Sequence, residues 1–208
     1  MKKISIVTNC YNEEKNISIL YEKVKEQMEK LPYEWEFIIE DNASTDNTVN
    51  VMNAAWGTMI SRDQVLLILS KSHKTVENIL KRNAFTISIP SSNYTTEADY
   101  FGVVSGNNIE NKLAHANLTS TKSNNIDAPI INELPISLEC TFIKYHEDEY
   151  IEGIIAKVEN IYADESVITN DKIDVSLLKA IAYNPYTNEY YEVSNKVGNA
   201  FKDGLKLK

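Results

Sequence analysis

In the first part of the chain, two short apolar runs typical of strands flank a segment whose apolar residues repeat at helical spacing. Residues 4–7 form a short apolar run rich in β-branched side chains, which predicts a buried strand. Apolar residues then repeat at helical spacing between positions 17 and 28, after Asn12, whose side chain can cap a helix. Residues 35–39 form a second strand candidate. A helix between two strands predicts a β-α-β unit, in which the two strands run parallel.

Further along the chain, most apolar segments have the length of strands and are separated by turn residues. The strand candidates are residues 49–56, 65–69, 85–89, 136–145 and 150–162. Helical spacing is confined to residues 74–82 and 175–180, and Asp174 can cap the second of these helices. Many strands and few helices predict a barrel or a sandwich.

The pattern changes in the polar stretch 41–48, so we expect two parts, residues 1–48 and 49–208. The length of 208 residues fits one domain with an appendage. A hydrophobic fraction of 43% and a charged fraction of 25% are typical of soluble globular proteins. The apolar runs are too short to span a bilayer, and the run after the basic start is too short for a secretory signal. We therefore expect a cytoplasmic protein without a membrane partner.

The net charge and the cysteine content argue against nucleic-acid-binding and metal-binding proteins. A net charge of −9 argues against a nucleic-acid partner. Cys10 and Cys140 belong to no CxxC motif or Cys/His cluster, so we expect no metal. Cys140 is interpreted as a buried strand residue rather than a nucleophile. We expect His115 and His146 to lie at the surface.

The chemically most informative stretch follows a predicted strand and begins a predicted helix. It consists of Ser70, Lys71, Ser72, His73, Lys74 and Thr75. A helix N-terminus presents N–H groups and a partial positive charge, which suit a phosphate group. The spacing alone supports a structural role at least equally well, in which Ser72 caps the helix and the lysines are solvated.

Two segments of the first part resemble a known family. Residues 7–14 and 37–46 are similar to the first and second strand-loop segments of family 2 nucleotide-sugar glycosyltransferases. The resemblance implies that an aspartate at the position of Asp41 helps to hold a nucleotide base. The sequence contains no Asp-x-Asp metal motif downstream, and without such a metal the leaving diphosphate cannot be neutralised. We therefore interpret this part as structural, with glycosyl transfer as a remote alternative.

The second part resembles a different family over most of its length. Residues 50–57, with the sequence NVMNAAWG, are similar to the NVMTAAW strand of flavoredoxin-type flavin reductases. Residues 85–91 and 98–106 match the next two signatures in order, and residues 197–201 match the closing segment. The sequence thus resembles the flavin reductase-like family of FMN-binding split barrels.

This resemblance implies an α+β fold that is mainly β, a split barrel with an N-terminal β-α-β appendage. It implies a homodimer that binds FMN at the subunit interface. The implied cofactor-binding residues are Asn53, Ala54, Ala55 and Trp56 near the ring, Ser70, Ser72, His73, Lys74 and Thr75 near the phosphate, and Ser105 close to the flavin. FMN would carry the redox chemistry with NADH or NADPH as donor, and hydride transfer to the flavin requires no catalytic acid or base from the protein.

Three alternatives to an NAD(P)H-dependent oxidoreductase stay open at this point. The first is a flavoredoxin-type electron carrier without nicotinamide turnover, and the second is an inactive fusion product. The third and most remote is a glycosyltransferase. Family members begin the barrel with a strand that this chain lacks. Residues 36–40 could replace it, with 41–48 as a hairpin turn and 49–56 as the partner strand. Four tyrosines near the end could stack on a ring or pack in a dimer interface, namely Tyr183, Tyr186, Tyr190 and Tyr191.

Overall fold

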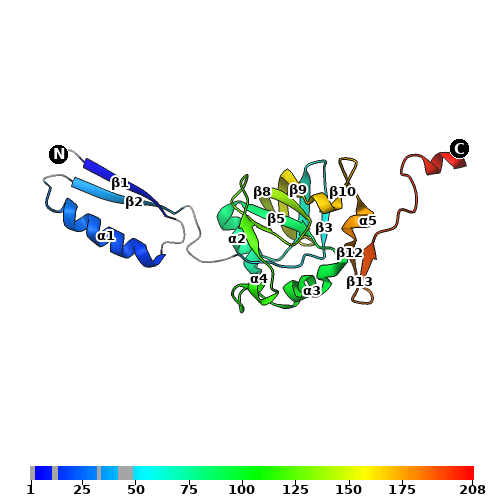
Figure 1. The fold of residues 1–208 in the computed structure, drawn as a ribbon, viewed down its shortest axis with the longest axis horizontal. Helices are drawn as coiled ribbons and strands as arrows, with labels where there is room; N and C mark the ends of the chain where they lie inside the picture. The colour runs from blue at the N-terminus through cyan, green and yellow to red at the C-terminus, as the bar shows by residue number, and fades with distance from the viewer. Residues whose placement is uncertain (1–2, 11–13, 32–33, 42–48) are drawn as a thin grey trace. The chain divides into compact units, whose positions relative to one another are not determined.

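The computed structural model describes residues 3–10, 14–31, 34–41 and 49–208. The chain divides into two compact units, Met1–Thr48 and Val49–Lys208, which we describe separately. None of the helices in these described stretches is both long and apolar enough to cross a membrane. The larger, second unit contains the central sheet and the segments discussed below as a site (Figure 1).

The first unit is the predicted β-α-β arrangement. Strand β1 (Lys3–Cys10) and strand β2 (Glu34–Asp41) pair in parallel, in a register that runs from Lys3 opposite Glu34 to Cys10 opposite Asp41. Helix α1 (Glu14–Met28) connects them, as a parallel pair requires. The predicted helix cap, Asn12, lies outside the described residues, as do residues 42–48 of the predicted turn.

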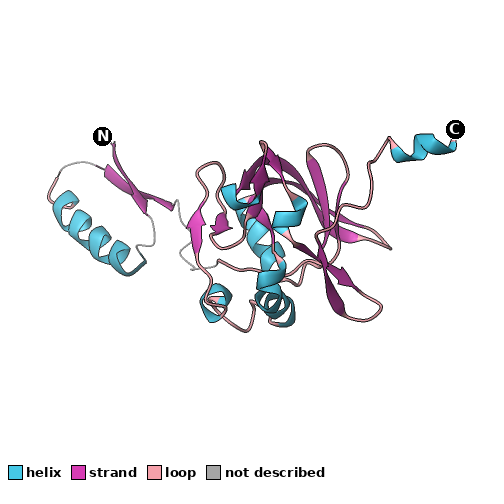
Figure 2. Cartoon of the chain, turned by 45° about the vertical axis from the view of Figure 1, so that its right-hand side comes forward, coloured by secondary structure: helices cyan, strands magenta, loops and turns pink. Residues whose placement is uncertain are grey.

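The second unit is built on one antiparallel sheet of five strands in the order β3-β4-β9-β8-β5. Figure 2 draws the strands of the chain in magenta and its helices in cyan. The strands are β3 (Gly57–Met59), β4 (Gln64–Ile68), β5 (Ala84–Ile89), β8 (Ile136–Glu147) and β9 (Glu152–Ala163). Strands β8 and β9 form a long hairpin with register shifts after Glu139 and Phe142, and such irregularities bend a strand. The sheet is therefore curved rather than flat.

Shorter elements surround this sheet. They are α2 (Lys74–Arg82), η1 (Ser92–Tyr94), α3 (Thr95–Val103), α4 (Lys112–His115), β6 (Ser120–Lys122), β7 (Pro129–Ile131), η2 (Glu165–Val167), β10 (Ile168–Thr169), β11 (Lys172–Ile173), α5 (Val175–Leu178), β12 (Ala180–Asn184), β13 (Glu189–Val193) and η3 (Asp203–Leu207). Three strand pairs lie outside the main sheet, and all are antiparallel: β6 with β7, β10 with β11 and β12 with β13.

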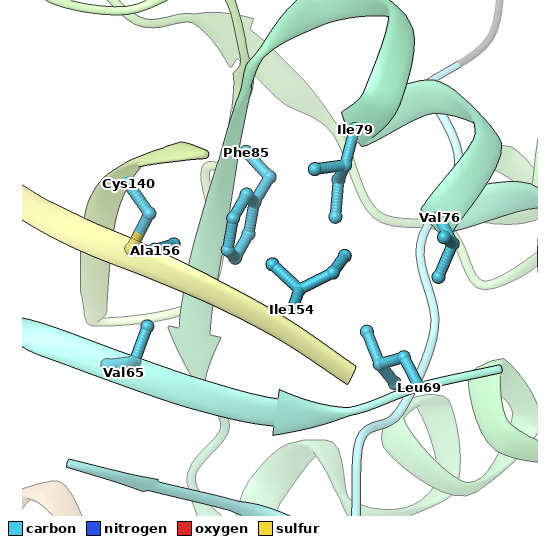
Figure 3. Close-up of a cluster of buried hydrophobic side chains, with 8 residues drawn as sticks. All are labelled: Val65, Leu69, Val76, Ile79, Phe85, Cys140, Ile154 and Ala156. Carbon is cyan, nitrogen blue, oxygen red and sulfur yellow. The ribbon is translucent and has the colours of Figure 1, made fainter. Parts of the chain in front are cut away.

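The main core lies between the sheet and helix α2 (Figure 3). Its buried members are Val65, Leu69, Val76, Ile79, Phe85, Cys140, Ile154 and Ala156. They come from β4 and the residue after it, from α2, and from β5, β8 and β9, so the core joins the helix to four strands. Burial raises the pKa of the Cys140 thiol to about 12, which keeps it a neutral thiol, as expected for a core residue. A second cluster packs Phe101 of α3 and Leu113 of α4 against Leu118, Ile131 and Leu134.

Most strand and helix predictions for this unit are confirmed. The helix predicted over residues 74–82 is α2, and the two long strands are β8 and β9. Helix α5 ends two residues earlier than predicted, and Asp174 caps it by accepting a hydrogen bond of 2.9 Å from the Ser176 N–H. Strand β9 starts later than predicted because the Asp148 carboxylate accepts the N–H groups of Tyr150 and Ile151, which places both in the turn.

The strand predicted over residues 49–56 is wrong. This segment is irregular, and its apolar side chains do alternate, but toward different clusters: Val49 and Val51 pack against the second cluster and Met52 against the main core. The predicted partner, residues 36–40, belongs to β2, which pairs with β1 in the first unit. Residues 42–48 of its proposed turn lie outside the described residues, so the replacement hairpin stays a prediction. Apolar alternation marks burial on two sides, and a strand further requires a neighbouring backbone to pair with.

The core predicts how the unit responds to truncation of its side chains. We expect Ile154→Ala to lower the free energy of unfolding by about 2–5 kcal/mol, because a large buried side chain leaves a cavity. The matched control is Ile151→Ala, an isoleucine three positions earlier that is exposed, with an expected loss of less than about 1 kcal/mol. Urea denaturation followed by circular dichroism measures both. Equal losses in the two variants would contradict this description of the core.

Candidate functional site

Three segments that are distant in the sequence meet at the start of helix α2. The Asn50 side-chain amide donates to the Thr75 hydroxyl at 2.6 Å, which joins the first segment of the unit to the helix. The Asn107 amide donates to the Ser72 backbone carbonyl at 3.1 Å, which joins the loop after α3 to the same turn. A Cβ atom on Gly106 would lie 2.1 Å from the Asn50 side-chain oxygen, so only glycine permits this approach.

The turn before α2 is organised by its own hydroxyl groups. The Ser70 and Ser72 hydroxyls lie 3.1 Å apart, and the His73 N–H donates to the Ser70 carbonyl at 3.1 Å. Ser72 does not cap the helix, so that structural interpretation is wrong. The N-cap is His73, whose side chain makes no capping hydrogen bond. The Val76 N–H donates to the His73 carbonyl at 3.0 Å, whereas the N–H groups of Lys74 and Thr75 have no described partner. Such N–H groups bind anions at a helix N-terminus.

The two lysines of this turn are paired rather than solvated. Lys74 is mostly covered and forms an ion pair of 3.1 Å with Glu77, which also pairs with Lys81 at 2.6 Å. Hydrogen bonds from these two lysines lower the pKa of Glu77, so this carboxylate is charged at neutral pH. Lys71 pairs with Glu147 and lies 4.9 Å from the centre of the Tyr145 ring. An anion at the helix start would therefore share Lys74 with Glu77.

A buried lysine fixes the segment 49–56 beside this turn. Lys112 is 2% exposed, and its ammonium group donates to the Val51 carbonyl at 2.6 Å and to the Phe101 carbonyl at 2.9 Å. Burial lowers its pKa. These bonds connect α4, the end of α3 and the segment 49–56 at one point. Sequence analysis missed Lys112, because a single lysine near a histidine carries no signal of burial.

Asn53 is held by the hairpin formed by β12 and β13. Its side-chain amide donates to the Tyr190 hydroxyl at 3.1 Å, and that hydroxyl donates to the Asp99 carboxylate at 3.0 Å. Tyr190 is therefore part of a network within the chain, whereas Tyr186 and Tyr191 are exposed. Sequence analysis missed Asp99 and the partner role of Tyr190, since nothing in their local patterns links residues this far apart.

The structure gathers most of the predicted site residues. Ser70, Ser72, His73, Lys74 and Thr75 form the turn and the start of α2. Ser105 lies beside them, because its hydroxyl accepts the N–H of Asn107, the residue bound to Ser72.

The remaining predicted residues follow Asn53 along the same segment. Ala54, Ala55 and Trp56 are exposed, and the Trp56 carbonyl accepts the Ile68 N–H at 2.9 Å. None of their side chains has a described hydrogen bond to the turn at residues 70–75, so the structure does not join these three predicted residues to that turn.

Comparison with known proteins identifies the class of this unit. The profile of the flavin reductase like domain matches residues 42–184. The flavoredoxin of Desulfovibrio vulgaris (Miyazaki F) is 34% identical, with a TM-score of 0.70 over 74% of this chain and 84% of that one. The flavoredoxin of Methanosarcina acetivorans is 24% identical, with a TM-score of 0.70 over 76% and 85% of the two chains. No curated protein sequence is significantly similar.

The antiparallel sheet and its flanking helices therefore form the split barrel of flavin reductase-like proteins. The chain belongs to the flavin reductase-like family, because the profile match covers more than half of it. An FMN-binding domain of a flavin reductase-like enzyme from Shewanella baltica shares the fold at 21% identity, with a TM-score of 0.62 over 72% of this chain and 82% of that one. The predicted fold class and family are confirmed.

The N-terminal resemblance is also found. The profile of glycosyl transferase family 2 matches residues 5–71, less than half of the chain. This range extends past the first unit into β4 and the turn before α2, where the described residues belong to the barrel. Among the described residues, no three His, Cys, Asp or Glu side chains are grouped as metal ligands.

The close approach at Gly106 provides a test of how the three segments are joined. We expect Gly106→Ala to lower the free energy of unfolding by about 1–3 kcal/mol, because the new methyl group displaces the Asn50 side chain from Thr75. The control is Gly204→Ala, where no atom lies within 4 Å of the new Cβ, with a change of less than about 0.5 kcal/mol. Thermal unfolding measures both, and equal melting temperatures would show that the segments are not joined in this way.

Proposed function

We propose that the barrel unit binds FMN with its phosphate group at the start of α2. The uncapped N-terminus of this helix, surrounded by the hydroxyls of Ser70, Ser72 and Thr75, supports this assignment most directly. A phosphate is doubly charged near neutral pH and accepts several hydrogen bonds, which matches a site made of hydroxyl and N–H donors with one lysine. The residues present therefore fit the group.

Each part of the site has a separate task in this proposal. Lys74 supplies the positive charge, with Glu77 holding its ammonium group in place beside the helix. The small side chains of Ala54 and Ala55 leave the backbone accessible to a flat ring, and Trp56 and Ser105 border the same surface. Asn53 is kept in position by Tyr190, and the carbonyl of Val51 by Lys112. These groups bind and orient, while bound FMN would supply the redox chemistry.

The proposed reaction is electron transfer from NADH or NADPH through FMN to an acceptor. Membership of the flavin reductase-like family supports an oxidoreductase of this type. The second candidate is an electron carrier without nicotinamide turnover, which is favoured by the 34% identity to a protein named flavoredoxin. Both candidates use the same site and differ only in the donor.

The phosphate assignment is tested by comparing FMN with riboflavin, which lacks the phosphate. We expect the purified chain to retain FMN. We expect Lys74→Gln to weaken FMN binding about tenfold, because the variant loses one charge-assisted hydrogen bond from a lysine that is shared with Glu77. Riboflavin binding should not change. The control is Lys172→Gln, an exposed lysine of β11.

Fluorescence titration of the flavin measures the FMN and riboflavin affinities of the unaltered chain and of both variants. An equal loss for FMN and riboflavin in Lys74→Gln would place the lysine away from the phosphate. Failure of the unaltered chain to bind FMN, as expected of an inactive fusion product, would overturn the proposal as a whole.

The donor is tested by the visible spectrum of the FMN-loaded protein under anaerobic conditions. We expect NADH or NADPH to bleach the flavin absorbance on mixing, at a rate that rises with the concentration of the nicotinamide. Dithionite provides the control, since it reduces any accessible bound flavin. Bleaching by dithionite but by neither nicotinamide would reject the reductase and favour the electron carrier.

A further inference from the structure

Asn53 is the position at which the segment 50–56 departs from the motif that it resembles. The chain has NVMNAAW where the flavoredoxin-type motif has NVMTAAW, so an amide replaces a hydroxyl group. An amide carries hydrogen-bond donors at one end and an acceptor at the other, whereas a hydroxyl group is both at once. The group that Asn53 presents to a ligand therefore depends on which end of its amide the protein holds.

Two successive hydrogen bonds fix the direction of this amide. The Asp99 carboxylate can only accept, so the Tyr190 hydroxyl donates its single proton to it, at 3.0 Å. The Tyr190 oxygen is then free to accept, and the Asn53 side-chain N–H donates to it at 3.1 Å. Burial and the Asp99 carboxylate raise the pKa of Tyr190, so the hydroxyl keeps its proton at neutral pH. The carboxylate on α3 thus determines the direction of both bonds.

The same side chain is confined by two elements of the barrel unit, α3 and the hairpin of β12 and β13 (Figure 1). A Cβ atom on Gly102 of α3 would lie 3.3 Å from the Asn53 Cβ, so the helix approaches closely. The ring of Tyr190 lies 5.6 Å from that of Tyr183 on the neighbouring strand, which supports the hydroxyl group. The Asn53 side-chain oxygen, at the other end of the amide, has no hydrogen-bond partner among the described residues.

We propose that Asn53 presents this oxygen to the ring of bound FMN, and that Tyr190 and Asp99 are positioning residues that fix its direction. The inference rests on the proposed flavin site. The oxidised ring has one N–H group, and a hydride from the nicotinamide breaks a C–H bond there and forms a second N–H on the ring. An acceptor oxygen held toward the ring stabilises the form with more N–H donors. The two hydrogen bonds therefore raise the reduction potential of bound FMN.

The test is the reduction potential of bound FMN, measured at neutral pH by equilibration with a reference dye. In Tyr190→Phe the amide loses its fixed direction, so the affinity for reduced relative to oxidised FMN should fall about three- to tenfold. For a two-electron couple this lowers the potential by about 15–30 mV. The matched control is Tyr191→Phe on the same strand, whose hydroxyl donates to Glu189 at 2.6 Å and whose loss should leave the potential unchanged.

A second variant separates this effect from a general loss of structure. Asn53→Leu removes the oxygen and should lower the potential at least as much. Adding Tyr190→Phe to it should cause no further shift, because residues that act through one contact are not additive. A full further shift in the double variant, or an unchanged potential in Tyr190→Phe, would overturn the inference. All variants are compared as FMN-loaded protein, so failure of the unaltered chain to bind FMN would contradict the proposed flavin site instead.

Discussion

The candidate site depends on one buried ammonium group. Lys112 is removed from water, and its charge is compensated by two backbone carbonyls and by no described carboxylate. A buried charge is tolerated only when its hydrogen bonds are made, so the positions of Val51 and Phe101 are tightly constrained. Val51 lies between Asn50 and Asn53, the two residues that connect the same segment to α2 and to the C-terminal hairpin. Lys112 thus fixes the middle of the segment 49–56, which forms no strand of the sheet.

The core and the site are joined through helix α2. The apolar face of this helix, with Val76 and Ile79, packs into the main cluster, while its first turn carries Lys74 and Thr75. Packing of Val76 and Ile79 in the core therefore fixes the position of the helix start. Such an arrangement lets the first turn keep N–H groups without a capping side chain, because tertiary contacts rather than the cap stabilise the helix.

Local patterns in the sequence predicted the limits of an element well where interactions between neighbouring residues determine them. The limits of α2 follow from the spacing of its apolar residues, and the start of α5 follows from its cap, Asp174; both signals involve neighbouring residues only. The segment 49–56 was predicted incorrectly because its alternation reflects two clusters on opposite sides rather than a ladder. The contacts of Lys112, Asn107 and Tyr190 join residues that are far apart in the sequence, and no spacing rule reveals them. Family resemblance predicted the site residues, and the structure shows which contacts hold them.

The irregular backbone of the segment 49–56 makes its position independent of strand register. A strand at this place would require a neighbour of matching register, and any change in the preceding residues would then disturb the sheet. The segment is held instead by side-chain hydrogen bonds from Asn50 and Asn53 and by the bond that Val51 accepts, and none of these depends on the register of the preceding residues. The sequence that precedes the barrel unit can therefore differ without shifting the strands of the sheet.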